Sequence, residues 1–460
     1  MRAPATDRGR LLSALAAVTA VTAVTVFTAT VPLLRDWFDL RVYHGAVDIW
    51  VHHGGRLYDY RVPGTAYGFT YPPFAAVAML PMALLDLRAA IAVGLLLNLA
   101  ALAVVVRLLT GRTWRRYGWY GCVLGACALA LFEPLRDTFS FGQVNVLLLA
   151  LVLVDAWLLA TGRERWAGAG IGLAAAVKLT PALFIGLLLV ARRGRAAAVA
   201  TVVALAATGF AAVVAPDASR FYWTDAMWDT TRVGRLDYVS NQSLQGVLAR
   251  LGETDRAVWA VAVLLTLGVW AVRARRAAAA GDWAAAFALT GLTACLVSPI
   301  TWVHHLVWLL PSFAVLVRTG HPRIAGALYA VLCTSVVWLW FDDASGVDGF
   351  LGGNTYTWIT LGLLLWLPVA QPRAARPNRA RSANAIEPAP SPAAPRTAQV
   401  SSQPGPAGSG DTAAAGAAAA ATGAASGPGC GLARSASSEP TGSTRPAAPN
   451  PQSSSARASS

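Results

Sequence analysis

The chain has 460 residues, of which 56% are hydrophobic and 13% are charged, and its mean hydropathy is +0.51. This composition excludes an ordinary soluble globular protein, because apolar runs of about 20 residues, the length that spans a bilayer, recur over the first 370 positions. The formal net charge of +14 does not indicate nucleic-acid binding, since the arginines fall in short clusters between apolar runs and in the C-terminal region.

The first expected membrane helix is the uncharged run 11–34, which follows three arginines and starts from the cytoplasm. It is longer than the core of a signal peptide and lacks a clear cleavage site of small residues. The next segment, 35–72, is rich in aspartate, histidine and aromatic residues. We therefore expect it to be partly helical and to lie at the outer membrane surface.

The remaining spans are expected from apolar run length, and the arginine clusters orient them. We place 111–116, 162–166, 192–195, 273–282 and 318–323 inside, and 133–143, 217–256 and 342–353 outside. The expected spans are approximately 88–110, 117–132, 144–161, 196–215, 257–273, 283–298, 303–318, 323–341 and 354–370.

Two apolar segments do not fit a simple alternation of spans. Residues 73–86 are short and rich in proline, and residues 167–191 have arginines at both ends and a break at Thr180-Pro181. Each is either a re-entrant or broken helix that lines a cavity enclosed by protein, or a pair of short spans. The predicted fold is an all-α, polytopic membrane protein with about 10–12 transmembrane helices.

Two domains are expected, a membrane domain over 1–370 and a C-terminal tail over 371–460. The tail consists mainly of alanine, proline, serine, glycine and arginine, so it cannot bury enough apolar surface to fold and is predicted to be disordered and cytoplasmic. It is either an interaction segment or a dispensable extension. The five cysteines are scattered, and they predict neither a disulfide framework nor a metal site.

Lys178 is the single lysine of the chain, and it lies within the apolar stretch 170–191. An ammonium at membrane depth costs roughly 2.5–3.5 kcal/mol, so it needs an anionic partner or a water-filled cavity. Snorkelling to an interface is the structural alternative. A partner in a cavity is favoured because Arg192 and Arg193 already serve the inner surface, and this placement indicates that a phosphate or carboxylate is handled inside the protein.

Four polar clusters interrupt the apolar pattern, three of them on the expected outer side. Asp39 follows the first span and can act as a general base if it reaches an acceptor hydroxyl, although acidic residues are also common in solvated loops. Gln143 and Asn145 begin a helix, where their amides either bind sugar hydroxyls or cap the helix.

The other two clusters precede or connect later helices. Asn241 and Gln242 lie before an apolar run that looks like a helix entrance. His304 and His305 point about 100° apart on a helix, so they cannot chelate one metal as an i,i+4 pair could. A phosphate or sugar contact is preferred over a metal, and amphipathic interfacial histidines are the alternative.

In this order the clusters resemble the membrane mannosyltransferases of glycosyltransferase family 87, which have the GT-C fold. The resemblance covers most of residues 36–310, and the tail lies outside it. The matching strings are Asp39-Leu40-Arg41-Val42-Tyr43, Tyr71-Pro72-Pro73, Gly142-Gln143-Val144-Asn145, Lys178-Leu179-Thr180-Pro181, Asn241-Gln242-Ser243-Leu244 and Ser298-Pro299-Ile300-Thr301-Trp302-Val303-His304-His305.

The resemblance implies that mannose is transferred from polyprenyl-phosphate mannose to a lipid-linked or cell-envelope glycan, with inversion to an α-linkage, α-1,2 in the expected product. It implies a multi-pass plasma-membrane enzyme with an outward-facing active site. Asp39 matches the family's first-loop aspartate and is the expected base. The expected contacts to the donor phosphate are Lys178, His304 and His305, and those to the sugar or acceptor are Tyr71, Gln143, Asn145, Asn241 and Gln242.

No cofactor is expected, and the sequence does not decide whether a divalent metal takes part, because Asp36, Asp39 and Asp48 have no diagnostic spacing. Two other functions compete with the enzyme. A transporter or flippase of a lipid-linked sugar also uses buried charges and broken helices, but no convincing internal repeat is present. A structural subunit of an envelope-synthesis complex is the other alternative.

Overall fold

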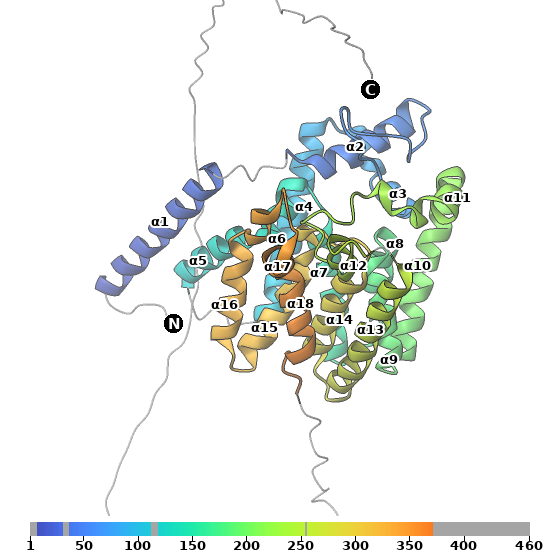
Figure 1. Cartoon of the computed structure of the whole chain (residues 1–460). Helices are drawn as coiled ribbons and strands as arrows, with labels where there is room; N and C mark the ends of the chain where they lie inside the picture. Colours follow the sequence, from blue (N-terminus) through green and yellow to red (C-terminus); the bar gives the residue numbers. More distant parts are fainter. Residues whose placement is uncertain (1–6, 31–35, 112–117, 254, 371–460) are drawn as a thin grey trace, which may run out of the picture. The chain divides into compact units, whose positions relative to one another are not determined.

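The computed structural model describes residues 7–30, 36–111, 118–253 and 255–370, and the chain within these ranges is almost entirely helical. The regular β-structure in this part of the chain is a single bridge between Arg61 and Gly68. The predicted tail, 371–460, lies outside the described residues. The all-α class predicted from sequence is thus confirmed (Figure 1).

Each predicted span contains a helix, because a long apolar run favours helix in a medium that cannot satisfy backbone groups. The span 303–318 contains Pro311 and is divided into a 3-10 helix, Val303–Leu309, and an α-helix, Leu310–Arg318. The principal helices are α1 (Asp7–Thr30), α2 (Phe38–His52), α3 (Pro73–Ala78), η1 (Leu80–Leu84), α4 (Leu87–Thr110), α5 (Gly118–Leu131), α6 (Glu133–Phe141), α7 (Asn145–Ala160), α8 (Ala169–Val177), η3 (Thr180–Ala182), α9 (Leu183–Val190), α10 (Gly194–Val214), α11 (Pro216–Thr224), α12 (Leu244–Arg250), α13 (Arg256–Ala279), α14 (Trp283–Val297), η6 (Val303–Leu309), α15 (Leu310–Arg318), α16 (Pro322–Cys333), η7 (Val336–Trp340), α17 (Gly346–Gly352) and α18 (Thr355–Trp366).

Four helices in the described ranges are long and apolar enough to cross a membrane without help from a neighbouring segment: α1, α4, α10 and α13. The pair α5 and α6 meets the same test together but is bent by 75°. The other predicted spans are built from shorter apolar helices, among them α7, α14, α16 and the η6–α15 pair. Helix length alone therefore supports fewer crossings than the 10–12 expected from hydropathy.

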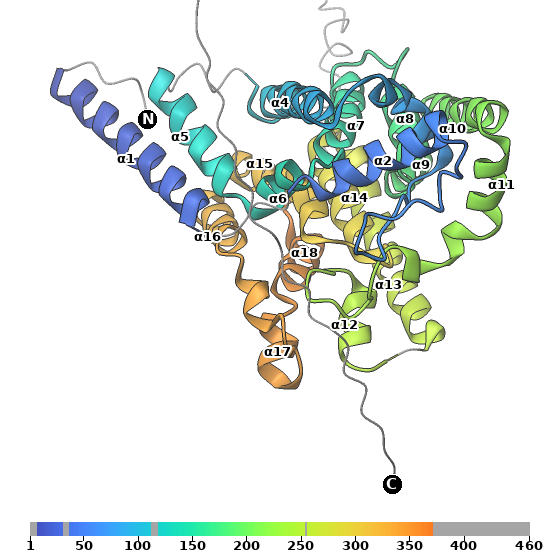
Figure 2. The same cartoon turned by 90° about the horizontal axis from the view of Figure 1, so that it is seen from above.

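The interior is formed mainly by α7, α8, α14 and the η6–α15 segment. Thirteen residues of α14 are buried, and this helix packs against α7, α13, α15 and α18. At the edge, α1 lies beside α5 in both views, and α10 packs along α8 (Figures 1 and 2). The central helices therefore form a scaffold that can hold polar groups away from lipid.

The segment 167–191 forms a re-entrant hairpin. Its first arm is α8 and its second is α9, and the break predicted at Thr180-Pro181 extends from Lys178 to η3. The two flanking loops meet, because Arg193 Nη1 forms an ion pair of 2.5 Å with Glu164 Oε1. Both ends of the hairpin therefore lie at the same end of the bundle, with Lys178 at its apex.

Loops that the charge pattern assigns to the same side of the membrane contact one another. On the side predicted to be inner, Arg193 stacks on Trp283 at 5.1 Å, and Arg318 pairs with Asp282 at 2.6 Å. On the side predicted to be outer, Gln242 donates to the Gly353 carbonyl at 2.7 Å. Each of these contacts joins segments that the charge pattern assigns to one side, and the sidedness itself stays a prediction.

Candidate active site

Asp39 lies in the first turn of α2, which is held close to the junction between α6 and α7. The backbone N–H of Trp37 donates to the Ser140 carbonyl at 3.0 Å. Gly142 ends α6 with a φ of +71°, and a Cβ added there would lie 2.6 Å from the Leu40 Cβ. A glycine is needed for both the left-handed backbone and the close approach. This packing brings Asp39 beside Gln143.

A hydrogen-bond chain begins at the Asp39 carboxylate. Gln143 Nε2 donates to Asp39 Oδ2 at 2.6 Å, and Gln143 Oε1 accepts from the Tyr71 hydroxyl at 2.7 Å. The Tyr71 hydroxyl in turn accepts from Tyr43 at 3.1 Å and from Lys178 Nζ at 3.3 Å. Because Tyr71 donates to its oxygen, the Gln143 amide is oriented with its nitrogen toward the carboxylate.

Tyr71 is positioned by the segment that enters α3. Pro73 occupies the first turn of this short helix, where a missing N–H is tolerated, and Pro72 has extended backbone. The Tyr71 carbonyl accepts a hydrogen bond of 2.8 Å from the Tyr58 hydroxyl. Tyr71 is therefore fixed at both its backbone and its hydroxyl.

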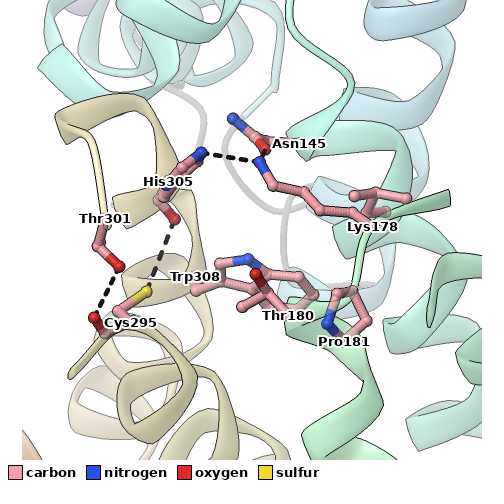
Figure 3. A pocket seen from close by; sticks show the side chains of 9 residues that line it. Asn145, Lys178, Thr180, Pro181, Cys295, Thr301, His305 and Trp308 are labelled. Carbon is pink, nitrogen blue, oxygen red and sulfur yellow. Dashed lines mark hydrogen bonds between the residues drawn. The ribbon is translucent and has the colours of Figure 1, made fainter. Parts of the chain in front are cut away.

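Lys178 lies where α8 ends, and its extended backbone directs the side chain into the interior. Figure 3 shows the amine between Asn145 and His305. The Nζ atom donates to Asn145 Oδ1 at 3.0 Å and lies 2.7 Å from His305 Nε2 and 5.0 Å from the centre of the Tyr71 ring. The lysine thus has polar partners in the interior, in agreement with the argument against snorkelling.

One arrangement of protons satisfies all of these hydrogen bonds. The Trp302 N–H donates to His305 Nδ1 at 3.1 Å, so a neutral His305 ring carries its hydrogen on Nε2. That hydrogen points to Lys178 Nζ, which already donates to Asn145 and Tyr71. An uncharged amine with two N–H groups and one lone pair satisfies all three contacts.

The polar chain borders a narrow cavity. Its lining includes Asn145, Lys178, Thr301, His305 and Trp308 (Figure 3). The space open to the centre of a water molecule is about 10 Å³, which is room for one water. A sugar phosphate therefore requires a wider opening than this cavity offers.

His304 and His305 lie in η6 and have different surroundings. The His305 ring reaches Lys178, whereas the buried His304 ring packs edge-on against Phe141 and His305 at centroid distances of 5.2 and 4.6 Å. The His304 carbonyl accepts from Thr138 at 3.0 Å and from Asn145 Nδ2 at 3.1 Å. These two hydrogen bonds attach η6 to α6 and α7 and fix its position relative to both helices.

Asn241 and Gln242 do not join this group. Both are fully buried. The Asn241 amide donates to the Leu236 and Pro299 carbonyls and accepts from the Thr301 N–H. The Gln242 amide donates to the Val239 and Gly353 carbonyls and accepts from Thr357. Backbone groups of the protein thus occupy the atoms that we expected to bind sugar.

The half-buried Asp39 carboxyl has altered acidity. Burial raises its pKa to about 6, and the Gln143 hydrogen bond opposes this rise, as does the charge of Lys178 whenever the amine is protonated. Among the described residues, Gln143 is the one group that hydrogen-bonds to this carboxylate. A carboxyl with this pKa is ionised at neutral pH and basic enough for proton abstraction.

Several polar residues of the site were not predicted from sequence. Tyr43 belongs to one of the matching strings but was given no role, and its hydroxyl donates to the Tyr71 hydroxyl. Glu133 is fully buried and accepts from Trp338 Nε1 at 2.6 Å and from the Tyr356 hydroxyl. The signal for Glu133 was its ionisable side chain at a junction between two apolar runs.

No metal centre is evident in the described ranges, where no group of three or more histidine, cysteine, aspartate or glutamate side chains is placed to hold an ion. The side chains of this site include one carboxylate, one amine and one imidazole, together with amide and phenol groups. Such a set can abstract a proton and hold an oxyanion.

Comparison with known proteins gives consistent matches. Residues 69–299 match the model for glycosyltransferase family 87. A protein of Mycobacterium tuberculosis (strain CDC 1551 / Oshkosh), described as a polyprenol-phosphate-mannose-dependent alpha-(1-2)-phosphatidylinositol pentamannoside mannosyltransferase, is 35% identical over 369 residues, which are 75% of this chain and 84% of the relative. A Mycolicibacterium smegmatis protein with the same description is 35% identical and covers 70% of this chain and 80% of its own length.

A third relative, from M. tuberculosis strain H37Rv, is described as a polyprenol-phosphate-mannose-dependent alpha-(1-2)-phosphatidylinositol mannoside mannosyltransferase. It is 35% identical over 321 residues, which are 65% of this chain and 74% of the relative. Relatives that are equally similar to this chain are thus described with different acceptors. No solved structure matches the chain significantly.

Proposed function

Because the chain belongs to glycosyltransferase family 87 and is a membrane glycosyltransferase, we propose that it transfers mannose from polyprenyl-phosphate mannose to a mannosylated phosphatidylinositol, forming an α-1,2 linkage. The family and the enzyme class predicted from sequence are confirmed. The observation that carries the proposal is the hydrogen-bond chain from Asp39 through Gln143 and Tyr71 to Lys178 and His305, which links a base to a phosphate site.

The proposed reaction is a single displacement at the anomeric carbon of the donor mannose. Asp39 takes the proton of the acceptor hydroxyl, whose oxygen forms a bond to the anomeric carbon as the bond to the phosphate oxygen breaks. The polyprenyl phosphate leaves with the bonding electron pair, and a β-linked donor gives an α-linked product. A phosphate beside Lys178 favours the protonated amine, which then stabilises the developing charge together with His305 Nε2.

The remaining residues support these groups. Gln143 and Tyr71 orient the carboxylate, and Asn145 positions Lys178 while also holding the His304 carbonyl. We assign Asn241 and Gln242 a positioning role for the segment 298–305, in place of the sugar contact expected from sequence. His304 acts through packing, whereas His305 faces the amine.

We further propose that the site opens to the outer face of the plasma membrane, with the two chain ends in the cytoplasm. The arginine-bearing loops 162–166, 192–195 and 318–323 support this orientation by the positive-inside rule. The site lies away from these loops, because Lys178 is at the apex of the hairpin whose two ends meet at Glu164 and Arg193.

The test is transfer by the purified protein in lipid, with a panel of polyprenyl-phosphate sugars as donors and phosphatidylinositol mannosides as acceptors. We expect Asp39→Asn to lower kcat by about 10²–10⁴-fold with unchanged membrane insertion, because only the base is lost. Asp36→Asn is the matched control, since the exposed Asp36 carboxylate pairs with Arg41. Undiminished transfer by Asp39→Asn refutes the assignment of the base. If the wild-type protein transfers no sugar but moves the donor across the bilayer, a flippase is favoured.

A further inference from the structure

Two arginines from separate outer segments converge on one backbone carbonyl. The Tyr58 carbonyl accepts from Arg61 Nη1 at 2.9 Å and from Arg232 Nη2 at 2.6 Å. The two guanidinium groups therefore lie close together, because both donate to the same oxygen atom. Like charges at this separation repel, so the arrangement needs an explanation beyond the capping of one carbonyl.

No carboxylate in the described part of the chain lies within ion-pair distance of either arginine, in contrast to Arg41 and Arg235, which pair with Asp36 and Asp237. Burial, followed by the charge of Arg232, lowers the pKa of Arg61, while Asp59 raises it. Arg232 lies near enough to exposed Asp229 to lower the pKa of that carboxyl, although a Thr231 hydrogen bond is the larger cause.

Arg232 also has an unused donor. Its Nε atom is buried and has no hydrogen-bond partner among the described residues. A guanidinium can bind a phosphate through two parallel N–H groups, and Arg is the residue best suited to such bidentate contacts. The two guanidinium groups have no carboxylate at ion-pair distance among the described residues, and one of them has a buried N–H without a hydrogen-bond partner. Such a pair is suited to binding an oxyanion.

The surroundings of the pair are those of a membrane interface. The Arg232 guanidinium lies 5.3 Å from the centre of the Phe221 ring. Trp223 and Trp228 follow in the same segment, and their exposed fractions are 36% and 71%. Tryptophan is enriched at the level of lipid headgroups, which is also the level of headgroup phosphates.

The pair is separate from the proposed donor-phosphate site. The Tyr58 carbonyl holds the arginines, while the Tyr58 hydroxyl donates to the Tyr71 carbonyl, and the Tyr71 hydroxyl is what contacts Lys178. The arginines and the amine thus contact different residues, and two tyrosine side chains lie along the hydrogen-bonded path between them. A phosphate held by the arginines is not the phosphate that leaves from mannose at Lys178.

We propose that Arg61 and Arg232 bind the phosphodiester of the anionic acceptor lipid and thereby direct its glycan toward Asp39. This proposal rests on the proposed function, in which the acceptor is a mannosylated phosphatidylinositol. The donor phosphate binds at Lys178 and the acceptor phosphate at the arginine pair, so the enzyme recognises two phosphodiesters at two places.

The kinetic test compares two acceptors with the same terminal mannose, a phosphatidylinositol mannoside and an alkyl mannoside without phosphate, at saturating donor. For Arg61→Gln and Arg232→Gln we expect KM for the anionic acceptor to rise about tenfold or more, with kcat changed less than about twofold. KM for the uncharged acceptor stays at the wild-type value. Arg61→Lys and Arg232→Lys keep a positive charge and are expected to recover part of the affinity.

Arg235→Gln is the matched control, because Arg235 lies on the same outer segment but pairs with Asp237. Equal loss with both acceptors in the glutamine variants indicates a structural role and overturns the proposal. Inorganic phosphate distinguishes a lipid headgroup from free phosphate as the source of the anion. If phosphate inhibits transfer to the anionic acceptor no more than a simple salt does at equal ionic strength, the lipid is supported. Specific, saturable inhibition by phosphate indicates a free-phosphate site and overturns the proposal.

A binding measurement separates this proposal from the proposed function. Short-chain phosphatidylinositol is expected to raise the thermal unfolding temperature of the wild-type protein, and the matching diacylglycerol is not. The rise is expected to be lost in Arg61→Gln/Arg232→Gln. If transfer of mannose fails but this lipid-specific rise is present and depends on the arginines, the proposed function is wrong and the anion site remains. Equal rises in wild type and double variant overturn the site.

Discussion

At the scale of single residues, the site depends on a carboxyl whose acidity is set by its surroundings. Asp39 is half-buried beside Gln143, and burial outweighs the stabilising hydrogen bond, so its pKa rises to about 6. The Gln143 amide acts against this rise because it favours the charged form. The balance between these two effects can be measured in the pH dependence of the reaction.

We expect kcat/KM to increase about tenfold per pH unit up to about pH 6 and to level off above it, because the base must be ionised. Gln143→Leu removes a hydrogen bond that lowers the Asp39 pKa, so its acidic limb is expected to move to higher pH. The pH profiles of kcat/KM for the acceptor, measured for both proteins at saturating donor, decide this. A limb that stays near pH 4 in wild type, or moves downward in the variant, contradicts the assigned environment.

Lys178 is the second residue whose role can be isolated. Lys178→Met keeps the apolar stem and removes the nitrogen that contacts Tyr71, Asn145 and His305. We expect KM for the donor to rise about tenfold or more, as one charge-assisted contact to phosphate is lost. Initial-rate measurements over donor concentration provide the check, and KM for the acceptor serves as the internal control. Wild-type donor kinetics would leave Lys178 a structural role.

Single residues could be predicted where polar chemistry interrupts an apolar sequence. Asp39, Gln143, Asn145, Lys178 and His305 stood out for this reason, and the structure connects them. Asn241 and Gln242 had the same signal but are used by the protein's own backbone. A sequence shows that a buried amide needs partners, but it does not show whether those partners are ligand or main chain.

At the scale of elements, the central feature is how α6 supports the histidine segment. Thr138 on this helix donates to the His304 carbonyl. At the other end of α6, Glu133 accepts from Trp338 and Tyr356, and Arg136 Nη2 donates to Ser335 at 2.7 Å. These contacts attach α6 to η7 and α18, so a disturbance at Glu133 is transmitted to the site.

Glu133→Ala is expected to destabilise the protein by about 3–5 kcal/mol, because the buried Tyr356 hydroxyl and the half-buried Trp338 N–H lose their acceptor and the buried Arg136 loses a nearby opposite charge. Thermal unfolding in detergent measures the change. Asp342→Ala is the control, since Asp342 is exposed and surface substitutions are usually within about 0.5 kcal/mol. A variant as stable as Asp342→Ala would mean that α6 is held by packing alone.

Elements were predictable to the extent that hydrophobic run length determines them. Runs such as 88–110 and 196–215 gave α4 and α10 with ends shifted by a residue or two. Within the expected span 323–341 the α-helix ends at Cys333, and a short 3-10 helix, η7, follows after Ser335, whose backbone is left-handed with a φ of +58°. The break at Thr180-Pro181 was visible, whereas the fold-back that joins Glu164 to Arg193 required tertiary contacts.

At the scale of the whole molecule, the loops separate into an arginine-bearing set and a set around the polar site. The first set is linked by Glu164–Arg193 and Asp282–Arg318, and the second by contacts such as Gln242–Gly353. The charge rule assigns the first set to the cytoplasm. The predicted tail, 371–460, follows directly after a residue whose N–H donates to Asp282, which belongs to the first set.

Removal of residues 371–460 is expected to leave mannose transfer within about twofold of wild type, because their composition cannot form a packed core. Transfer rates of the truncated and full-length proteins, compared at equal amounts in membranes, measure this. A large loss of rate with normal insertion would assign the tail a functional contact.

The orientation itself can be tested with single cysteines in a background whose five native cysteines are replaced by alanine. Thr65 lies at an exposed turn in the loop that follows α2, and Gly162 lies at an exposed turn between α7 and α8. An outward-facing site predicts that a membrane-impermeant maleimide labels Thr65→Cys in intact cells, and that it labels Gly162→Cys only after permeabilisation. The reverse pattern would place the Asp39–Lys178 site in the cytoplasm, where the arginine-rich loops would then have to face outward against the positive-inside rule. Labelling of both positions in intact cells would place 162–166 and the loop that follows α2 on the same side and contradict the predicted topology.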